Sequence, residues 1–134
     1  MKPTLLDTDT LSLFLRKDLQ VNRRVWHEIA QFGHLTFSEF SYYEITRGLK
    51  AKGAPKQLAN FEQFSLAHHI LPFTHQASFI AADIWADLKR RGQLVGEIDI
   101  LIAAIALNEG LTVATHNTAH FSRIPNLNIV DWMV

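Results

Sequence analysis

Four side chains at widely separated points of the chain could act together on a phosphate ester. They are Asp7, Glu44, Asp99 and Asn117. Carboxylates gathered in one cleft repel one another, which raises their pKa values or attracts a divalent cation. Mg²⁺ and Mn²⁺ prefer oxygen ligands, and such an ion polarises phosphoryl oxygens and supplies hydroxide near neutral pH. These residue types predict metal-assisted phosphate chemistry if the fold brings them together.

The elements that must position these residues alternate between short apolar segments and helical patterns. Strands are predicted at residues 4–8, 35–38, 69–73, 111–115 and 127–132. Helices are predicted at residues 11–25 (in one or two pieces), 41–49, 56–66, 77–91 and 99–109. This alternation predicts an α/β fold with a mostly parallel central sheet flanked by helices on both faces.

The predicted topology brings the polar residues to one edge of the sheet. Ligands of open α/β sheets bind beyond the carboxyl ends of the strands. Asp7 lies at the carboxyl end of the first predicted strand, Asn117 comes just after the strand that ends at residue 115, and Glu44 lies early in the helix after the second strand. Asp99 joins them if the helix that it opens also begins at that edge. A carboxylate ending a buried strand needs partners, so Asp7 is the strongest of the four.

Structural roles compete with each of these interpretations. Asp9 could cap a helix that begins near residue 10, and Ser41 and Glu44 have the spacing of a capping box. Asp99 suits a helix N-terminus on electrostatic grounds alone, and Asn117 suits a turn. The sequence leaves both kinds of role open.

Composition and charge bound the class of protein. We expect one domain over residues 1–134, with 48% apolar residues, 13 basic and 13 acidic residues and no cysteine. The absence of cysteine excludes disulfide scaffolds, cysteine-based metal sites and a thiol nucleophile, and it fits the cytoplasm. The longest apolar run, residues 100–107, is too short to span a membrane, and the first residues do not form a secretory signal.

Local basic clusters remain available for nucleic acid despite the zero net charge. One comprises Arg47, Lys50, Lys52 and Lys56, and the other comprises residues 89–91. Judged alone, these clusters are better explained as solvated helix ends, because cations favour helix C-termini. Which basic residues would contact a nucleic acid is left open.

The order and spacing of the acidic stations resemble the PIN-domain family, and within it the VapC-type toxin ribonucleases of toxin–antitoxin pairs. The segment LLDTD at residues 5–9 is similar to the opening strand of the family, which carries the first acidic ligand. Glu44 lies where the family has a helix glutamate. The closest match is GEIDILIAA at residues 96–104. It is followed by VATHN at residues 113–117 and by Phe121, Arg123, Pro125, Leu127 and Trp132.

The resemblance implies a homodimer, Mg²⁺-dependent RNA cleavage (with Mn²⁺ as an alternative ion) and inhibition by a cognate antitoxin. Asp7 and Asp99 would hold the metal, while Glu44 and Asn117 would position water and Glu44 would help to deprotonate it. Two departures stand out. Asp9 occupies a position that is commonly Asn in the family, and Asn117 stands at a station that is Asp or Asn.

Two other classes of function remain open. In a phosphoaspartate-type phosphohydrolase, Asp7 would be the nucleophile and Asp9 the acid–base partner. That class normally has Thr or Val where Leu11 stands, and it needs a late lysine, whereas Lys89 is the last one here. The third class is a catalytically inactive binding module with the same fold.

Overall fold

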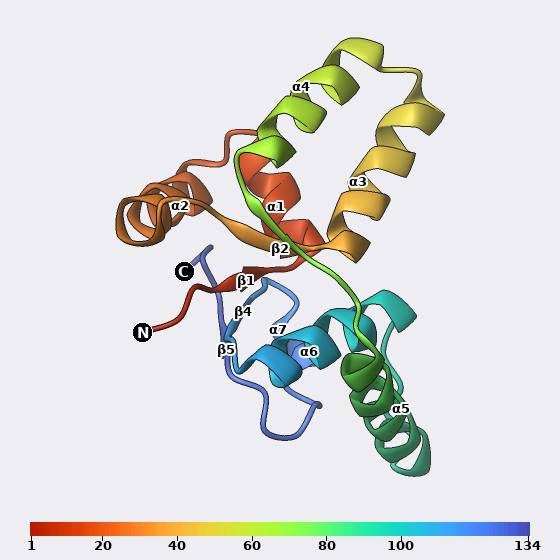
Figure 1. Cartoon of the computed structure of the whole chain (residues 1–134). Coiled ribbons are helices and arrows are strands. Elements are labelled where there is room, and N and C mark those ends of the chain that lie inside the picture. The colour runs from red at the N-terminus through yellow and green to blue at the C-terminus, as the bar shows by residue number, and fades with distance from the viewer.

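Five short strands form the parallel sheet at the centre of the chain in a computed structural model, which describes residues 1–134 (Figure 1). Across the sheet the strands run β3 (His69–Leu71), β2 (Thr36–Ser38), β1 (Leu5–Leu6), β4 (Val113–Ala114) and β5 (Ile129–Val130). Every neighbouring pair is parallel. The predicted α/β fold with a parallel sheet is confirmed.

Helices cover both faces of this sheet. One group comprises α1 (Thr8–Leu15), α2 (Leu19–Phe32), α3 (Glu39–Lys52) and α4 (Pro55–Leu66). The other comprises α5 (His75–Arg90), α6 (Glu97–Glu109) and the short α7 (Thr118–Phe121). Figure 1 shows the first group on one side of the strands and the second group on the other. None of the helices combines the length and the apolar character needed to cross a membrane.

The two faces bury separate apolar cores because side chains alternate along each strand. Leu5 packs with the α5 and α6 side of the sheet, whereas Leu6 packs with Val21, Val25 and Phe37 on the other side. Helix α6 is apolar nearly all round and is buried against the first of these cores. A helix of this kind is stable only inside a fold, which explains its place beside the sheet.

The starts of two helices correct the sequence interpretation. The strand predicted over residues 4–8 ends at Leu6, because Asp7 is the N-cap of α1 and Thr8 is already helical. Asp9 is therefore not the cap. Helix α3 begins at Glu39 with Ser38 as its N-cap, so the proposed capping box from Ser41 is wrong and Glu44 is free for another contact.

Candidate active site

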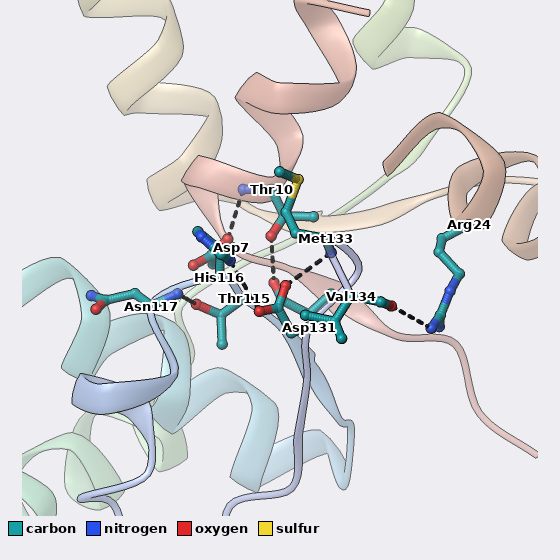
Figure 2. Close-up of polar contacts among 10 residues, drawn as sticks. Asp7, Thr10, Arg24, Thr115, His116, Asn117, Asp131, Met133 and Val134 are labelled. Atoms are coloured by element: carbon teal, nitrogen blue, oxygen red, sulfur yellow. Dashed lines mark hydrogen bonds and ion pairs between the residues drawn. The ribbon is translucent and has the colours of Figure 1, made fainter. Parts of the chain in front are cut away.

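Asp7 lies where the connections of the sheet diverge. Strand β1 has β2 on one side and β4 on the other, which makes the carboxyl end of β1 the usual ligand site of such sheets. The Asp7 Oδ1 atom accepts a 2.8 Å hydrogen bond from the backbone N–H of Thr10, and the Thr10 hydroxyl donates to the Ala114 carbonyl (Figure 2). These contacts fix the carboxylate at the sheet edge.

The Asp7 carboxylate is almost completely buried, with 2% of the residue exposed. Burial raises its pKa because the charged form loses water. The hydroxyl of Thr115 and the Thr10 N–H partly offset that rise, and repulsion from Asp9 adds to it. Asp9 thus adds negative charge to this edge, which answers the question left open by the sequence.

Asp99 lies in the first turn of α6 and faces the same charges. Burial, followed by repulsion from Asp7 and Asp9, raises its pKa to about 6. His120 lowers the Asp99 pKa, and Glu44 raises it further. Carboxylates at the end of β1 and on α1, α3 and α6 therefore share one electrostatic environment, although α3 and α6 are distant from α1 in the sequence.

Asn117 holds Asp99 in place. Its backbone N–H donates a 2.9 Å hydrogen bond to the Thr115 hydroxyl, as Figure 2 shows. Its Nδ2 atom donates to Asp99 Oδ2 at 3.3 Å and lies 2.8 Å from Nδ1 of His120. An amide nitrogen carries two hydrogens, so one can serve the carboxylate and the other can point toward His120. The side chain thereby orients Asp99 and leaves its own Oδ1 atom free.

Glu44 is held by residues from two helices. The Thr8 hydroxyl donates a 2.6 Å hydrogen bond to Glu44 Oε1, and Arg47 lies 3.6 Å from Oε2. The Thr8 and Ser41 hydroxyls are 3.0 Å apart. Because the single Thr8 proton goes to Glu44, Ser41 is the donor in that second contact. Glu44 therefore faces the shared edge from the α1 and α3 side.

The donor set suits a hard divalent cation that keeps water in its coordination shell. No group of three or more His, Cys, Asp or Glu side chains forms a ready-made metal site. Mg²⁺ does not need one, because it commonly takes one or two carboxylates together with water and substrate phosphate. Asp7 and Asp99 provide two carboxylates whose raised pKa values reflect burial and uncompensated negative charge.

The sequence as a whole matches a known family. The PIN domain family matches residues 4–127. The chain belongs to the PIN domain family. One relative, the tRNA(fMet)-specific endonuclease VapC of Salmonella typhimurium, is 31% identical over 129 residues, which cover 96% of each chain. Ribonuclease VapC2 of Rickettsia felis is 28% identical over 105 residues, or 78% of each chain.

Solved structures of PIN-domain relatives share the fold over nearly the whole chain. VapBC from Salmonella typhimurium, in a DNA-bound crystal structure, superposes with a TM-score of 0.87 at 30% identity, covering 98% of this chain and 99% of that one. VapBC2 from Rickettsia felis gives the same TM-score and coverage at 23% identity, which supports the fold alone.

These matches confirm the family resemblance and identify the chain as a VapC-type ribonuclease toxin. They speak against the phosphoaspartate phosphohydrolase and against the inactive binding module. The roles of Asp7, Glu44, Asp99 and Asn117 stay predictions, because no relative assigns individual residues.

Sequence reasoning missed the polar residues that support the acidic ones. Thr8 and Ser41 orient Glu44, and His120 contacts Asn117. The short helix α7, which was not predicted, carries His120 toward Asn117, whereas His116 lies 3.0 Å from Asp131. The one available signal was the cluster of hydroxyls beside the acidic stations.

Proposed function

We propose that this PIN-domain ribonuclease is a Mg²⁺-dependent endoribonuclease whose catalytic residues are Asp7, Glu44, Asp99 and Asn117. The observation that carries the proposal is geometric: the fold brings Asp7, held by Thr10, and Asp99, held by Asn117, to one edge of the sheet. Burial, followed by repulsion from the neighbouring carboxylates, accordingly raises the pKa of Asp99 to about 6. Negative charges gathered beside a buried carboxylate raise the electrostatic free energy of the fold, and a bound cation would lower it.

Asp7 and Asp99 are the residues that would hold the ion. Asp7 is fixed by Thr10 through Oδ1, and Asp99 is fixed by Asn117 through Oδ2. Each carboxylate therefore presents its remaining lone pairs in a set direction. When bound, Mg²⁺ or Mn²⁺ would supply positive charge that polarises a phosphoryl oxygen and lowers the pKa of water.

Glu44 is the group that would accept a proton during cleavage. Water adds its oxygen to phosphorus, one P–O bond to a ribose oxygen breaks, and the leaving oxygen takes up a proton. The attacking water loses a proton in the same reaction, and an ionised Glu44 can receive it. The hydrogen bond from Thr8 keeps that carboxylate facing the edge that Asp7 and Asp99 share.

We propose the substrate and the protein partner from the names of the relatives. We assign RNA as the substrate, because the Salmonella relative is named a tRNA(fMet)-specific endonuclease and others are named ribonucleases. A cognate antitoxin would inhibit the protein, since one solved structure with the same fold is a toxin–antitoxin complex from Klebsiella pneumoniae. We propose that the protein acts in the cytoplasm, because its proposed substrate is RNA and because a chain without cysteine fits a reducing compartment.

We also propose a homodimer, for which the exposed aromatic residues of α5 are the natural contact. Phe79 is 71% exposed and Trp85 is 44% exposed, so both aromatic side chains are available for a contact with a second copy of the chain. Sedimentation of the purified protein would show a dimer, and a Phe79→Glu change would shift it toward monomer. A monomeric parent protein would contradict this assignment.

The central test uses the purified protein, freed of its antitoxin, on a total RNA pool. We expect cleavage with Mg²⁺, loss of cleavage with a chelator, and loss in Asp7→Asn and Asp99→Asn variants. Asparagine keeps the N-cap acceptor at position 7, so the fold is preserved while the charge is removed. Cleavage that continues unchanged in the chelator would refute the metal-dependent function.

A further inference from the structure

A groove of about 850 Å³ runs away from the acidic edge between α1, α3 and α4. Thr8 and Glu44 line it, so the groove and the candidate active site share these two residues. Asp7, Asp99 and Asn117 do not line it. The groove therefore adjoins the candidate active site at Thr8 and Glu44 and extends away from Asp7, Asp99 and Asn117.

Three cations line the groove without an ionic partner. Arg16 and Lys17 stand at the end of α1, and Lys52 stands at the end of α3. None of them is in a salt bridge, and none donates a side-chain hydrogen bond to another residue. Apolar side chains and the amides of Gln57 and Asn60 line the groove between them. A cationic groove with an apolar and amide floor suits an anionic chain with flat bases.

Lys17 occupies a backbone position that favours glycine. Its φ angle is 64°, in the left-handed region, and it ends α1 in a helix-terminating motif in which Asp18 N–H bonds to the Leu13 carbonyl. Four glycines of this chain adopt positive φ, and three of them cap α2, α3 and α6. At α1 the chain has instead a strained, positively charged residue that lines the groove. Strain of this kind points to a role outside folding.

Gly48 is the reverse case in the same groove, because it is a glycine at a position where a helix favours a side chain. It lies in the interior of α3, where glycine weakens a helix, and it lines the groove. A Cβ atom placed there would meet nothing within 4 Å, so packing does not require a glycine. Its missing side chain leaves room in the groove. Lys17 and Gly48 are thus both unfavourable for the helix that each one ends or occupies. Lys17 adds a positive charge to the groove, and Gly48 leaves space in it.

We propose that this groove binds the ribose–phosphate backbone of single-stranded RNA next to the cleaved bond, with Lys17, Arg16 and Lys52 on the phosphates. The proposal rests on the proposed function, because it extends the path of the RNA beyond the acidic edge. An RNA strand whose scissile phosphate lies at Asp7 and Asp99 can continue past Thr8 and Glu44 into the groove. Cations along the backbone and an apolar floor for bases are the means by which proteins bind single strands.

The charge of the groove favours RNA over a peptide. Every nucleotide carries a phosphate, so the three cations are matched at regular intervals by any RNA sequence, whereas a peptide would need acidic residues at fixed positions. A protein that fits the same groove is the alternative that the experiment must separate.

The test measures binding of a short, labelled single-stranded oligoribonucleotide in the presence of a chelator, over a series of salt concentrations. Lys17→Gly and Lys52→Ala should each weaken binding and reduce the slope of log K against log salt by about 0.7. Gly48→Leu, a good helix former, should weaken binding at every salt concentration by filling the groove. Lys50→Ala is the matched control, because Lys50 lies in the same last turn of α3 but outside the groove.

Melting curves show whether each variant is folded, and Lys17→Gly and Gly48→Leu are expected to melt no lower than the parent. Weaker RNA binding at unchanged or higher stability is a result that a purely structural role cannot give. If the parent binds and cleaves RNA but all three groove variants do so equally well, the proposal is wrong. If these variants lose only inhibition by the antitoxin, the groove docks a protein and the proposal is again wrong. A parent that neither binds nor cleaves RNA refutes the proposed function itself.

Discussion

The hydroxyl of Thr8 donates a 2.6 Å hydrogen bond to the carboxylate of Glu44, although 36 residues separate them in the chain. This bond joins the first turn of α1 to α3 beside the sheet edge that carries Asp7. Ser41, which is fully buried, lies 3.0 Å from the same hydroxyl. The direction of Glu44 is therefore set by two hydroxyl groups rather than by the cap of its own helix.

Replacing Thr8 by valine keeps the shape of the side chain but removes the hydroxyl. We expect kcat to fall about tenfold, because Glu44 loses the contact that aims it, and the free energy of unfolding to fall by about 1 kcal/mol. Single-turnover cleavage of RNA measures the first effect and a denaturant melt the second. Thr8→Ser retains the donor and should behave like the parent. Equal loss in both variants would mean that the hydroxyl is not what orients Glu44.

Replacing Asn117 by aspartate would turn a hydrogen-bond donor to Asp99 into a like charge. Metal-free protein at pH 7.5 should then melt at a lower temperature than the parent, because the new carboxylate lies beside one whose pKa is already raised. Added Mg²⁺ should narrow the difference. Thermal melts with and without Mg²⁺ measure both quantities, and a variant equally stable in the two conditions would argue against a cation at this edge.

The pKa of about 6 at Asp99 predicts how metal binding depends on pH. Above pH 6 the carboxylate is ionised and can hold a cation, whereas below pH 6 a proton competes for it. We expect the affinity for Mg²⁺ to fall about tenfold for each pH unit below 6, with cleavage activity falling in parallel. Calorimetric titrations between pH 5 and pH 8 would measure this, and an affinity that is flat across the range would contradict it.

The same raised pKa makes ionised Asp99 unfavourable to the metal-free fold. A group whose folded pKa is raised stabilises the fold at low pH and loses that contribution as pH rises through the folded value. Asp99→Asn should therefore raise the free energy of unfolding at pH 7.5 without metal, by about 1 kcal/mol once screening of this partly exposed group is considered. Chemical denaturation measures it, and the gain should vanish below pH 3.8, the ordinary aspartate value, where Asp99 is protonated in both the folded and the unfolded state.

His68, which directly precedes β3, gives a second pH dependence. Its Nδ1 atom accepts a 2.8 Å hydrogen bond from the Leu35 N–H, which requires a neutral ring. Burial, together with His34, lowers the His68 pKa below its usual 6.5, so the free energy of unfolding should fall as pH drops below about 6.5. The slope should be smaller in His68→Gln, which can still accept the bond. An unchanged slope in that variant would assign the pH dependence to other groups.

The sequence was sufficient to predict where Asp7 and Asn117 lie, because buried strands precede both and parallel strands end at one edge. It was also sufficient to predict that residues 99–109 form a buried helix, since almost every residue there is apolar. The start of α3 was missed because Ser38 and Ser41 are equally good N-caps by type, and only the contact from Ser41 N–H to Ser38 decides between them.

Contacts between distant helices could not be predicted. The Thr8–Glu44 bond depends on the angle between α1 and α3, and no local pattern encodes that angle. The groove has the same origin, since its walls come from three helices. Lys17 and Gly48 do carry a local signal. Lys17 stands just after α1 where glycine is favoured, and Gly48 stands inside α3 where glycine is disfavoured. These two signals can be recognised only once the helix boundaries are known.

Calorimetric titration of Mg²⁺ into the metal-free protein, compared with Asp7→Asn and Asp99→Asn, tests most directly whether these two carboxylates share one ion. The account predicts saturable binding by the parent at pH 7.5, an affinity at least tenfold lower in either variant, and a loss of RNA cleavage that follows the loss of binding. Undiminished Mg²⁺ affinity in both variants, with both proteins folded, would contradict it.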